Sequence, residues 1–163
     1  MTRVAVIPAC LALLPEYRSQ GDPVADLRAA VDTAVAWLGA PVAVVASGPG
    51  ARVAAAALDR RAEHSGDEPS ILVTLNGSAS RTPKAPAYFD PRAEGFDDEL
   101  RAALLGPDAA ALRHVDAALG SELGADLDTL GEFADLVGDA RLVSVDYDDA
   151  RYGVQFWAMR WQA

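Results

Sequence analysis

Val42-Ala43-Val44-Val45-Ala46-Ser47-Gly48-Pro49-Gly50 joins a short apolar run to a glycine-rich loop. A continuously apolar run of this length, rich in β-branched valine, is typical of an interior strand of a parallel sheet. Glycine and proline directly after the run indicate a tight turn. The stretch therefore predicts a buried parallel strand over 42–46 and an α/β fold built around it.

Strand and helix patterns alternate on both sides of this stretch. Arg3 to Ile7 and Ser70 to Leu75 are two further short β-branched runs. Between the strands, apolar residues recur at helical spacing from Val24 to Leu38, and a second helix is expected from about Ala51 to Glu63. This β-α-β-α-β order predicts a doubly wound, mostly parallel sheet in three layers, with helices on both faces and right-handed crossovers.

The second half of the chain carries further helical patterns and then two strands. The link from Asp148 to Gly153 is too short for the crossover helix that a parallel pair needs, so we expect an antiparallel C-terminal pair with one strand at an edge. Helices are expected over 96–105, 109–123 and 127–137, and strands over 141–147 and 154–161. A chain of 163 residues is the size of one domain, which we expect to span 1–163.

The charge of the chain bounds its partners. Fourteen Lys and Arg against 24 Asp and Glu give a net charge of −10. This charge repels phosphate backbones and anionic lipids, so neither nucleic acid nor a membrane is expected as a partner. The apolar run Val4 to Leu14 is interrupted by Pro8 and is too short to span a bilayer. The single Cys10 cannot form an intramolecular disulfide, which fits a cytoplasmic protein.

The segment from Asn76 to Gly95 has neither the helical nor the strand period. Segments of more than about 12 to 15 residues without regular structure are usually functional or disordered, so a ligand site is predicted here first. Arg81 and Lys84 either fix the carboxylate or phosphate of a small ligand or pair with acids at the surface, and both interpretations stay open. The candidate ligand-binding residues are Asn76, Gly77, Ser78, Ser80, Arg81, Thr82, Lys84 and Tyr88.

Other candidates follow the first two predicted strands, where ligands bind in open α/β folds. Ala9 and Cys10 follow the first strand, and Ser47 and Gly48 the second. Cys10 is either a nucleophile or a buried thiol, and the thiol is favoured because no histidine has a claim to act as its base. The N–H groups after Ser47 either bind an anion or simply form a turn, and the turn is favoured.

Candidate metal ligands are few. His64 lies among Glu63, Asp67 and Glu68 in a charged loop, and His114 lies on a predicted helix. A third candidate is the acidic turn from Asp146 to Asp149, which also contains Asp148. Loop charge usually faces solvent and aspartate is common in turns for reasons of local hydrogen bonding, so we predict no bound metal at any of them.

Three stretches carry a family resemblance: Ala5 to Glu16 (AVIPACLALLPE), Asn76 to Ala93 (NGSASRTPKAPAYFDPRA), and Tyr147 to Val154 (YDDARYGV) with Trp161. Together they resemble the catalytic-subunit family of class III extradiol ring-cleavage dioxygenases, in an alanine-rich bacterial form. The middle stretch is the most specific, because the family segment reads Gly-Asp-Gly-Ser, Arg-Thr, Lys-Ala-Pro-Gly-Tyr and Asp-Pro-Arg-Ala. The chain looks like a shortened version, with few residues between the second strand and this motif.

The resemblance implies a ferrous ion held by two histidines and a carboxylate, with open positions for a catecholate and dioxygen. In the family the first histidine leaves strand one, and here that position is Ala9. The aspartate before Gly-Ser is Asn76 in this chain. Neither replacement supplies the ligand that the iron chemistry requires.

We therefore expect a protein that is similar to these catalytic subunits, has no cofactor and is of unassigned activity. It would bind a small anionic or aromatic ligand, or a protein partner, through the loop after the third strand. The alternative is an active non-haem Fe(II) extradiol dioxygenase acting on a catechol, with iron held by His64 and Asp or Glu residues. A homo-oligomer is a further expectation, because a shortened α/β domain exposes surface that a dimer can cover.

Overall fold

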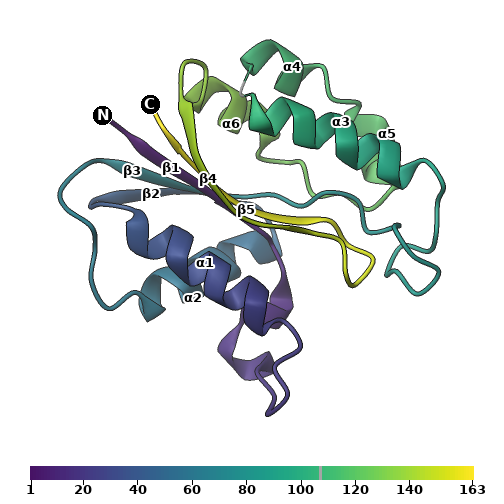
Figure 1. Ribbon diagram of the computed structural model, residues 1–163, viewed down its shortest axis with the longest axis horizontal. Coiled ribbons are helices and arrows are strands. Elements are labelled where there is room, and N and C mark those ends of the chain that lie inside the picture. The colour runs from purple at the N-terminus through teal and green to yellow at the C-terminus, as the bar shows by residue number, and fades with distance from the viewer. Residues whose placement is uncertain (107) are drawn as a thin grey trace.

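The computed structural model describes residues 1–106 and 108–163. Its strands are β1 (Arg3–Ile7), β2 (Val42–Val45), β3 (Ser70–Thr74), β4 (Arg141–Asp149) and β5 (Phe156–Gln162). They form one open sheet in the order β2-β3-β1-β5-β4, shown in Figure 1. β3 is parallel to both β1 and β2, whereas β5 is antiparallel to both β1 and β4.

The predicted α/β class and the antiparallel C-terminal pair are confirmed, and β4 is an edge strand as expected. The sheet is mixed, so the prediction of a mostly parallel sheet is wrong. The reason is the short β4–β5 link, which forces the pair to be antiparallel and allows β5 to occupy the place beside β1.

Helices lie on either side of the sheet in Figure 1, with α1 and α2 on one side and α3 to α6 on the other.

The predicted single helix over 109–123 is two helices, because Asp116 accepts a hydrogen bond from the N–H of Leu119 at 3.0 Å and caps a new helix start. The bounds are α1 (Ala25–Trp37), α2 (Pro49–Arg60), α3 (Ala93–Leu105), α4 (Ala109–Arg113), α5 (Ala117–Glu122) and α6 (Leu130–Leu136), with short 3-10 turns at Leu11–Leu13 and Pro15–Tyr17. In the described part of the chain, no helix has both the length and the apolarity to cross a membrane.

The core has two parts, one on each face of the sheet. Ala5 and Ile7 of β1 pack with α1 and α2, whereas Val4 and Val6 pack with α3 to α6. This alternation follows from the period of two in a strand. The C-terminal strand β5 supplies Trp157 and Trp161 to the part of the core beneath α3 to α6. There the Phe133 ring of α6 packs edge-on against the Trp161 ring, with 5.1 Å between the ring centroids.

The crossovers do not all have the same hand. The connection from β1 to β2 passes β3, and the connection from β2 back to β3 runs in the opposite direction across the sheet. Since α1 and α2 pack on the same face, the two connections have opposite hands, and the prediction of uniformly right-handed crossovers is wrong. The connection from β3 to β4 runs over the other face and shares the hand of the first.

The stretch over 42–46 forms the predicted strand but not an interior one. β2 pairs only with β3 and lies at the edge of the sheet. Ala43 and Val44 are exposed, Val44 by 45%. An apolar run without flanking charge does not distinguish an edge strand from a central one, because both kinds of strand are rich in β-branched residues.

The strand directions bring three segments to one edge of the sheet. β1, β3 and β4 all run the same way. The residues that follow these strands therefore meet at their carboxyl ends, where β5 begins. These segments are the region after Ile7, the long loop after Thr74 and the turn after Asp149.

Candidate functional site

The loop between β3 and α3 is ordered by the β4–β5 turn. The N–H of Gly77 donates to the carbonyl of Gln155 at 2.9 Å, and the N–H of Gln155 donates to the carbonyl of Ser78 at 2.9 Å. Arg81 then donates its N–H to the carbonyl of Gly153 at 3.0 Å. The loop thus lies along residues 153–155 almost like an extra strand, which explains how a segment without regular periodicity holds a fixed shape.

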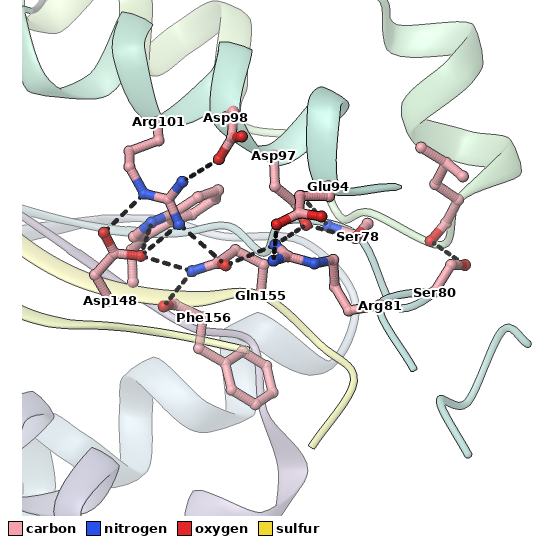
Figure 2. Close-up of polar contacts among 12 residues, drawn as sticks. Ser78, Ser80, Arg81, Glu94, Asp97, Asp98, Arg101, Asp148, Gln155 and Phe156 are labelled. Carbon is pink, nitrogen blue, oxygen red and sulfur yellow. Dashed lines mark hydrogen bonds and ion pairs between the residues drawn. The ribbon is translucent and has the colours of Figure 1, made fainter. Parts of the chain in front are cut away.

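A buried carboxylate anchors the same loop from the other side (Figure 2). Asp97 of α3 is fully buried and accepts hydrogen bonds from the N–H of Ser78 at 2.7 Å and from its hydroxyl at 2.6 Å. Arg81 adds a third donor at 3.2 Å and also reaches Gln155 Oε1 at 3.2 Å. Gly77 is needed here, because a Cβ at this position would lie 2.7 Å from Asp97 Oδ1.

A second carboxylate joins β4 to α3 and β5. Asp148 receives a bidentate pair from Arg101, at 2.8 and 2.9 Å, and hydrogen bonds from Gln155 at 2.8 Å and the Trp157 indole at 2.9 Å. Gln155 also accepts from both arginines through Oε1, so it connects the Asp97 and Asp148 clusters. The two acids and two arginines form one continuous network under the loop.

We predict that Asp148 makes stability depend on pH in acid. Burial raises the pKa of Asp148, but the hydrogen bonds and charge of Arg101, with the donors Trp157 and Gln155, outweigh burial and hold the pKa below its ordinary value. A carboxyl whose folded pKa is depressed stabilises the fold above its unfolded pKa of about 3.9 and loses that contribution as pH falls through the folded pKa. Asp148→Asn should cost about 1 to 2 kcal/mol at pH 7 and flatten the decline below about pH 4, as measured by urea unfolding.

The control for this pH effect is Asp135→Asn, which removes an exposed ion pair with Arg113. Exposed pairs contribute less than about 1 kcal/mol, so this variant should keep the wild-type decline in acid. Equal acid profiles for Asp148→Asn and the wild type would show that the Asp148 cluster does not set the pH dependence.

The structure places the predicted ligand residues of the loop in different surroundings. The network takes up Arg81, which pairs with Asp97 and has a side chain only 18% exposed. Thr82 and Lys84 line a cavity outside the network. Tyr88 is 82% exposed and has a positive φ of 64°. The remaining candidates, Gly77, Ser78 and Ser80, are buried, and Asn76 is half-buried.

Two adjoining cavities open beside this loop. The first, which we call the cationic mouth, has a volume of about 500 Å³ and is lined by Thr82, Pro83, Lys84, Arg151 and Tyr152. The second, the apolar slot, has about 260 Å³ and includes Ala12, Val24, Pro86, Val154 and Phe156. Tyr152 lines both. The pair lies where the segments after β1, β3 and β4 meet, the usual place for a ligand in an open α/β sheet.

A buried arginine holds the backbone beside the apolar slot. Arg28 of α1 is 6% exposed and donates to the carbonyls of Leu13 at 2.6 Å and Ala12 at 2.9 Å. Asp22 balances its charge at 3.1 Å. Tyr152 is held from the same side, because its hydroxyl donates to the carbonyl of Pro23. The slot is therefore bounded by groups with fixed hydrogen-bond partners.

Cys10 also lines the apolar slot. Burial raises the pKa of its thiol, and the weaker opposing effects of the Ala12 and Leu13 backbone and of Arg28 do not reverse the shift. The group is accordingly a neutral thiol near pH 7. At the second strand end, the Ser47 hydroxyl donates to Asp128 at 3.1 Å, and Gly48 turns the chain with a φ of 49° into α2.

The end of β1 does not fit the iron site that the family resemblance implies. Ala9 offers no side-chain donor, and its N–H donates to Asn76 Oδ1 at 2.9 Å, which occupies that oxygen. Within the described residues the buried Thr74 hydroxyl has no hydrogen-bond partner, and Gly50 approaches it so closely that a Cβ on Gly50 would lie 2.2 Å from the hydroxyl oxygen. Among the described residues, no group of three or more His, Cys, Asp and Glu side chains is placed to hold a metal ion.

The other candidate metal ligands lie apart. His64 is exposed in its loop, and His114 is exposed at the end of α4. The predicted acidic turn is wrong, because Asp146 and Asp148 belong to β4, which extends two residues beyond the expected strand. Asp146 pairs with Arg160 of β5 at 2.7 Å. Cross-strand pairing therefore engages these carboxylates.

Sequence reasoning misses two arginines that shape the cavities. Arg151 lies in a stretch that only the family resemblance marks, and no motif identifies it as ligand-binding. The helical pattern places Arg28 away from the apolar face of its helix, but its partners are backbone carbonyls after β1, which no side-chain pattern can reveal.

The chain matches no protein-family model, and no curated protein sequence matches it significantly.

Proposed function

We propose that this chain is a small-ligand-binding domain similar to the catalytic subunits of class III extradiol dioxygenases, with a three-layer α/β architecture and without iron chemistry. The ligand is a small organic anion, and it binds in the cationic mouth and apolar slot. The observation that carries this proposal is a pair of cavities at the carboxyl ends of the strands, one lined by Lys84 and Arg151 and the other apolar, with Tyr152 in the lining of both.

The size and chemistry of the cavities support a small molecule. Ligand sites commonly have volumes of about 300 to 1,000 Å³ and combine apolar walls with a few polar groups. The cationic mouth supplies two cations and the Thr82 hydroxyl, and the apolar slot supplies the walls. In a chain of net charge −10, two cations on one cavity favour an anionic group there over other parts of the surface.

A binding test for this proposal uses the amide spectrum of the intact ¹⁵N-labelled protein. A panel of small organic anions is titrated, and the expected result is that at least one shifts the amides of residues 10–12, 82–86 and 151–156. Lys84→Ala should weaken that ligand several-fold, because one charge-assisted contact is lost. A panel that shifts no amide of either cavity would refute the proposal.

Iron content tests the catalytic alternative directly. Protein reconstituted anaerobically with ferrous iron and then desalted is expected to retain far less than one iron per chain and to leave catechol unopened. The reason is the donor set, since the methyl group of Ala9 replaces an imidazole ligand. Ala9→His tests the reason itself, because iron retention by the variant but not by the wild type isolates that position. About one tightly held iron per wild-type chain would overturn the assignment.

A cytoplasmic homo-oligomer belongs to the same proposal. β2 and β4 are open sheet edges, and Val143 and Val145 on β4 are each 40% exposed. Exposed edges of this kind are ready to pair with a second chain. Light scattering of the purified protein decides between a monomer of 17.1 kDa and a multiple of it.

A further inference from the structure

We infer that the ligand is an aliphatic monocarboxylate, with its carboxylate between Lys84 and Arg151 and its alkyl chain in the apolar slot. This inference rests on the proposed function and specifies the ligand class of the same site. It follows from the charges around the cationic mouth, from the position of Tyr152 between the cavities, and from the lining of the slot.

The charges around the cationic mouth favour one negative charge. Arg151 faces Asp26 at 3.4 Å and Asp149 at 3.7 Å, and the two acid side chains are 75% and 46% exposed. These ion pairs are long and exposed, so they contribute little to the stability of the fold. A ligand carboxylate can therefore displace the acids from Arg151. Among the ion pairs of the described residues, none involves Lys84. Asp26 and Asp149 both lie beside Arg151, so a dianion such as phosphate would meet more repulsion there than a single carboxylate that displaces Asp26.

The ring of Tyr152 requires a flexible ligand. The ring lines both cavities, its hydroxyl is fixed to the Pro23 carbonyl, and the Arg151 guanidinium lies 5.9 Å from its centre. A molecule that occupies both cavities must pass around this ring. A saturated chain can bend at each methylene group. A carboxylate bonded directly to an aromatic ring cannot bend in this way, because its carbon stays on the axis of that ring. The position of the Tyr152 ring therefore favours a ligand whose charged and apolar ends are joined by an alkyl chain.

The lining of the apolar slot sets the other end of the ligand. Its walls include Ala12, Val24, Pro86, Val154 and Phe156, and each methylene group that is buried there strengthens binding. A dry cavity of about 150 Å³ can hold benzene, so a slot of about 260 Å³ has room for a chain of several carbons. A neutral alcohol would gain the same burial without the ion pair, and an amine would be repelled by both cations.

The experiment titrates the full chain with hexanoate, 1-hexanol, hexylamine, benzoate and inorganic phosphate, observed by amide shifts and calorimetry. Hexanoate is expected to bind at least ten-fold more tightly than each of the others. Lys84→Ala with Arg151→Ala should weaken hexanoate at least ten-fold, and both positions are exposed, so the fold should persist. Ala12→Leu, which narrows the slot, should weaken hexanoate but leave any phosphate binding unchanged. Asp26→Asn should tighten hexanoate about two- to five-fold, because it frees Arg151.

The results separate this inference from the proposed function. Binding of benzoate or phosphate at the cavity amides with equal or greater affinity than hexanoate would overturn the ligand class but leave the proposed site intact. Hexanoate affinity unchanged in the double variant would overturn the assignment of the carboxylate. No cavity shift with any of the five compounds, or with the wider panel above, would overturn the inference and the proposed function together.

Discussion

Replacing Asp97 with alanine is expected to lower the free energy of unfolding by about 3 to 5 kcal/mol. The carboxylate is fully buried and accepts two hydrogen bonds from Ser78 and one from Arg81. Without it, the Ser78 N–H and hydroxyl lose their acceptor, and the Arg81 guanidinium loses its closest counter-charge. Buried polar groups left unpaired cost their full desolvation penalty, which exceeds the net value of the original bonds. Urea unfolding followed by circular dichroism measures the loss.

Asp98 provides the matched control, because it is the next residue on α3 and carries the same charge. Its side chain is 61% exposed, and within the described part of the chain its one ion-pair partner is Arg101, three residues further along the helix. Asp98→Ala should therefore change stability by less than about 1 kcal/mol. If both variants lost the same stability, the effect would come from helix charge, and the anchoring role of Asp97 would be refuted.

The fold was predictable wherever local pattern determines structure. Buried β-branched runs predicted β1 and β3, and the short final link predicted the antiparallel pair of β4 and β5. The strand order was not predictable in the same way, because β2 has the composition of an interior strand and lies at an edge. That position depends on which face α3 to α6 cover, and this information is spread over the whole chain.

The site was predictable as a region but not as a set of roles. The aperiodic loop drew attention to Arg81 and Lys84 together, yet Arg81 turns inward to Asp97 and Lys84 lines the cationic mouth. Two cations three residues apart look alike in sequence. What separates them is a buried acid 16 residues away from Arg81 on another element, and such a pairing is visible only in three dimensions.

The joint between the loop and the β4–β5 turn is where a single methyl group should have a large effect. Gly153 has a φ of 81°, and a Cβ there would lie 2.6 Å from Ala85 Cβ, 2.7 Å from Thr82 Oγ1 and 2.9 Å from the Ala85 Cα. Gly153→Ala should cost about 2 to 4 kcal/mol, which combines left-handed backbone strain with overpacking against backbone.

The same substitution should also weaken ligand binding, because Thr82 and Lys84 form one wall of the cationic mouth and Arg151 and Tyr152 form the opposite wall. A methyl group at Gly153 pushes these walls apart at the point where they touch. Gly131→Ala on α6 is the control, since nothing lies within 4 Å of its added Cβ and alanine favours a helix by up to about 1 kcal/mol. Urea midpoints and hexanoate titrations of both variants measure the difference. A Gly153→Ala protein as stable as Gly131→Ala would mean that the turn and the loop are not in contact, and the cationic mouth would then have no fixed shape with which to select a ligand.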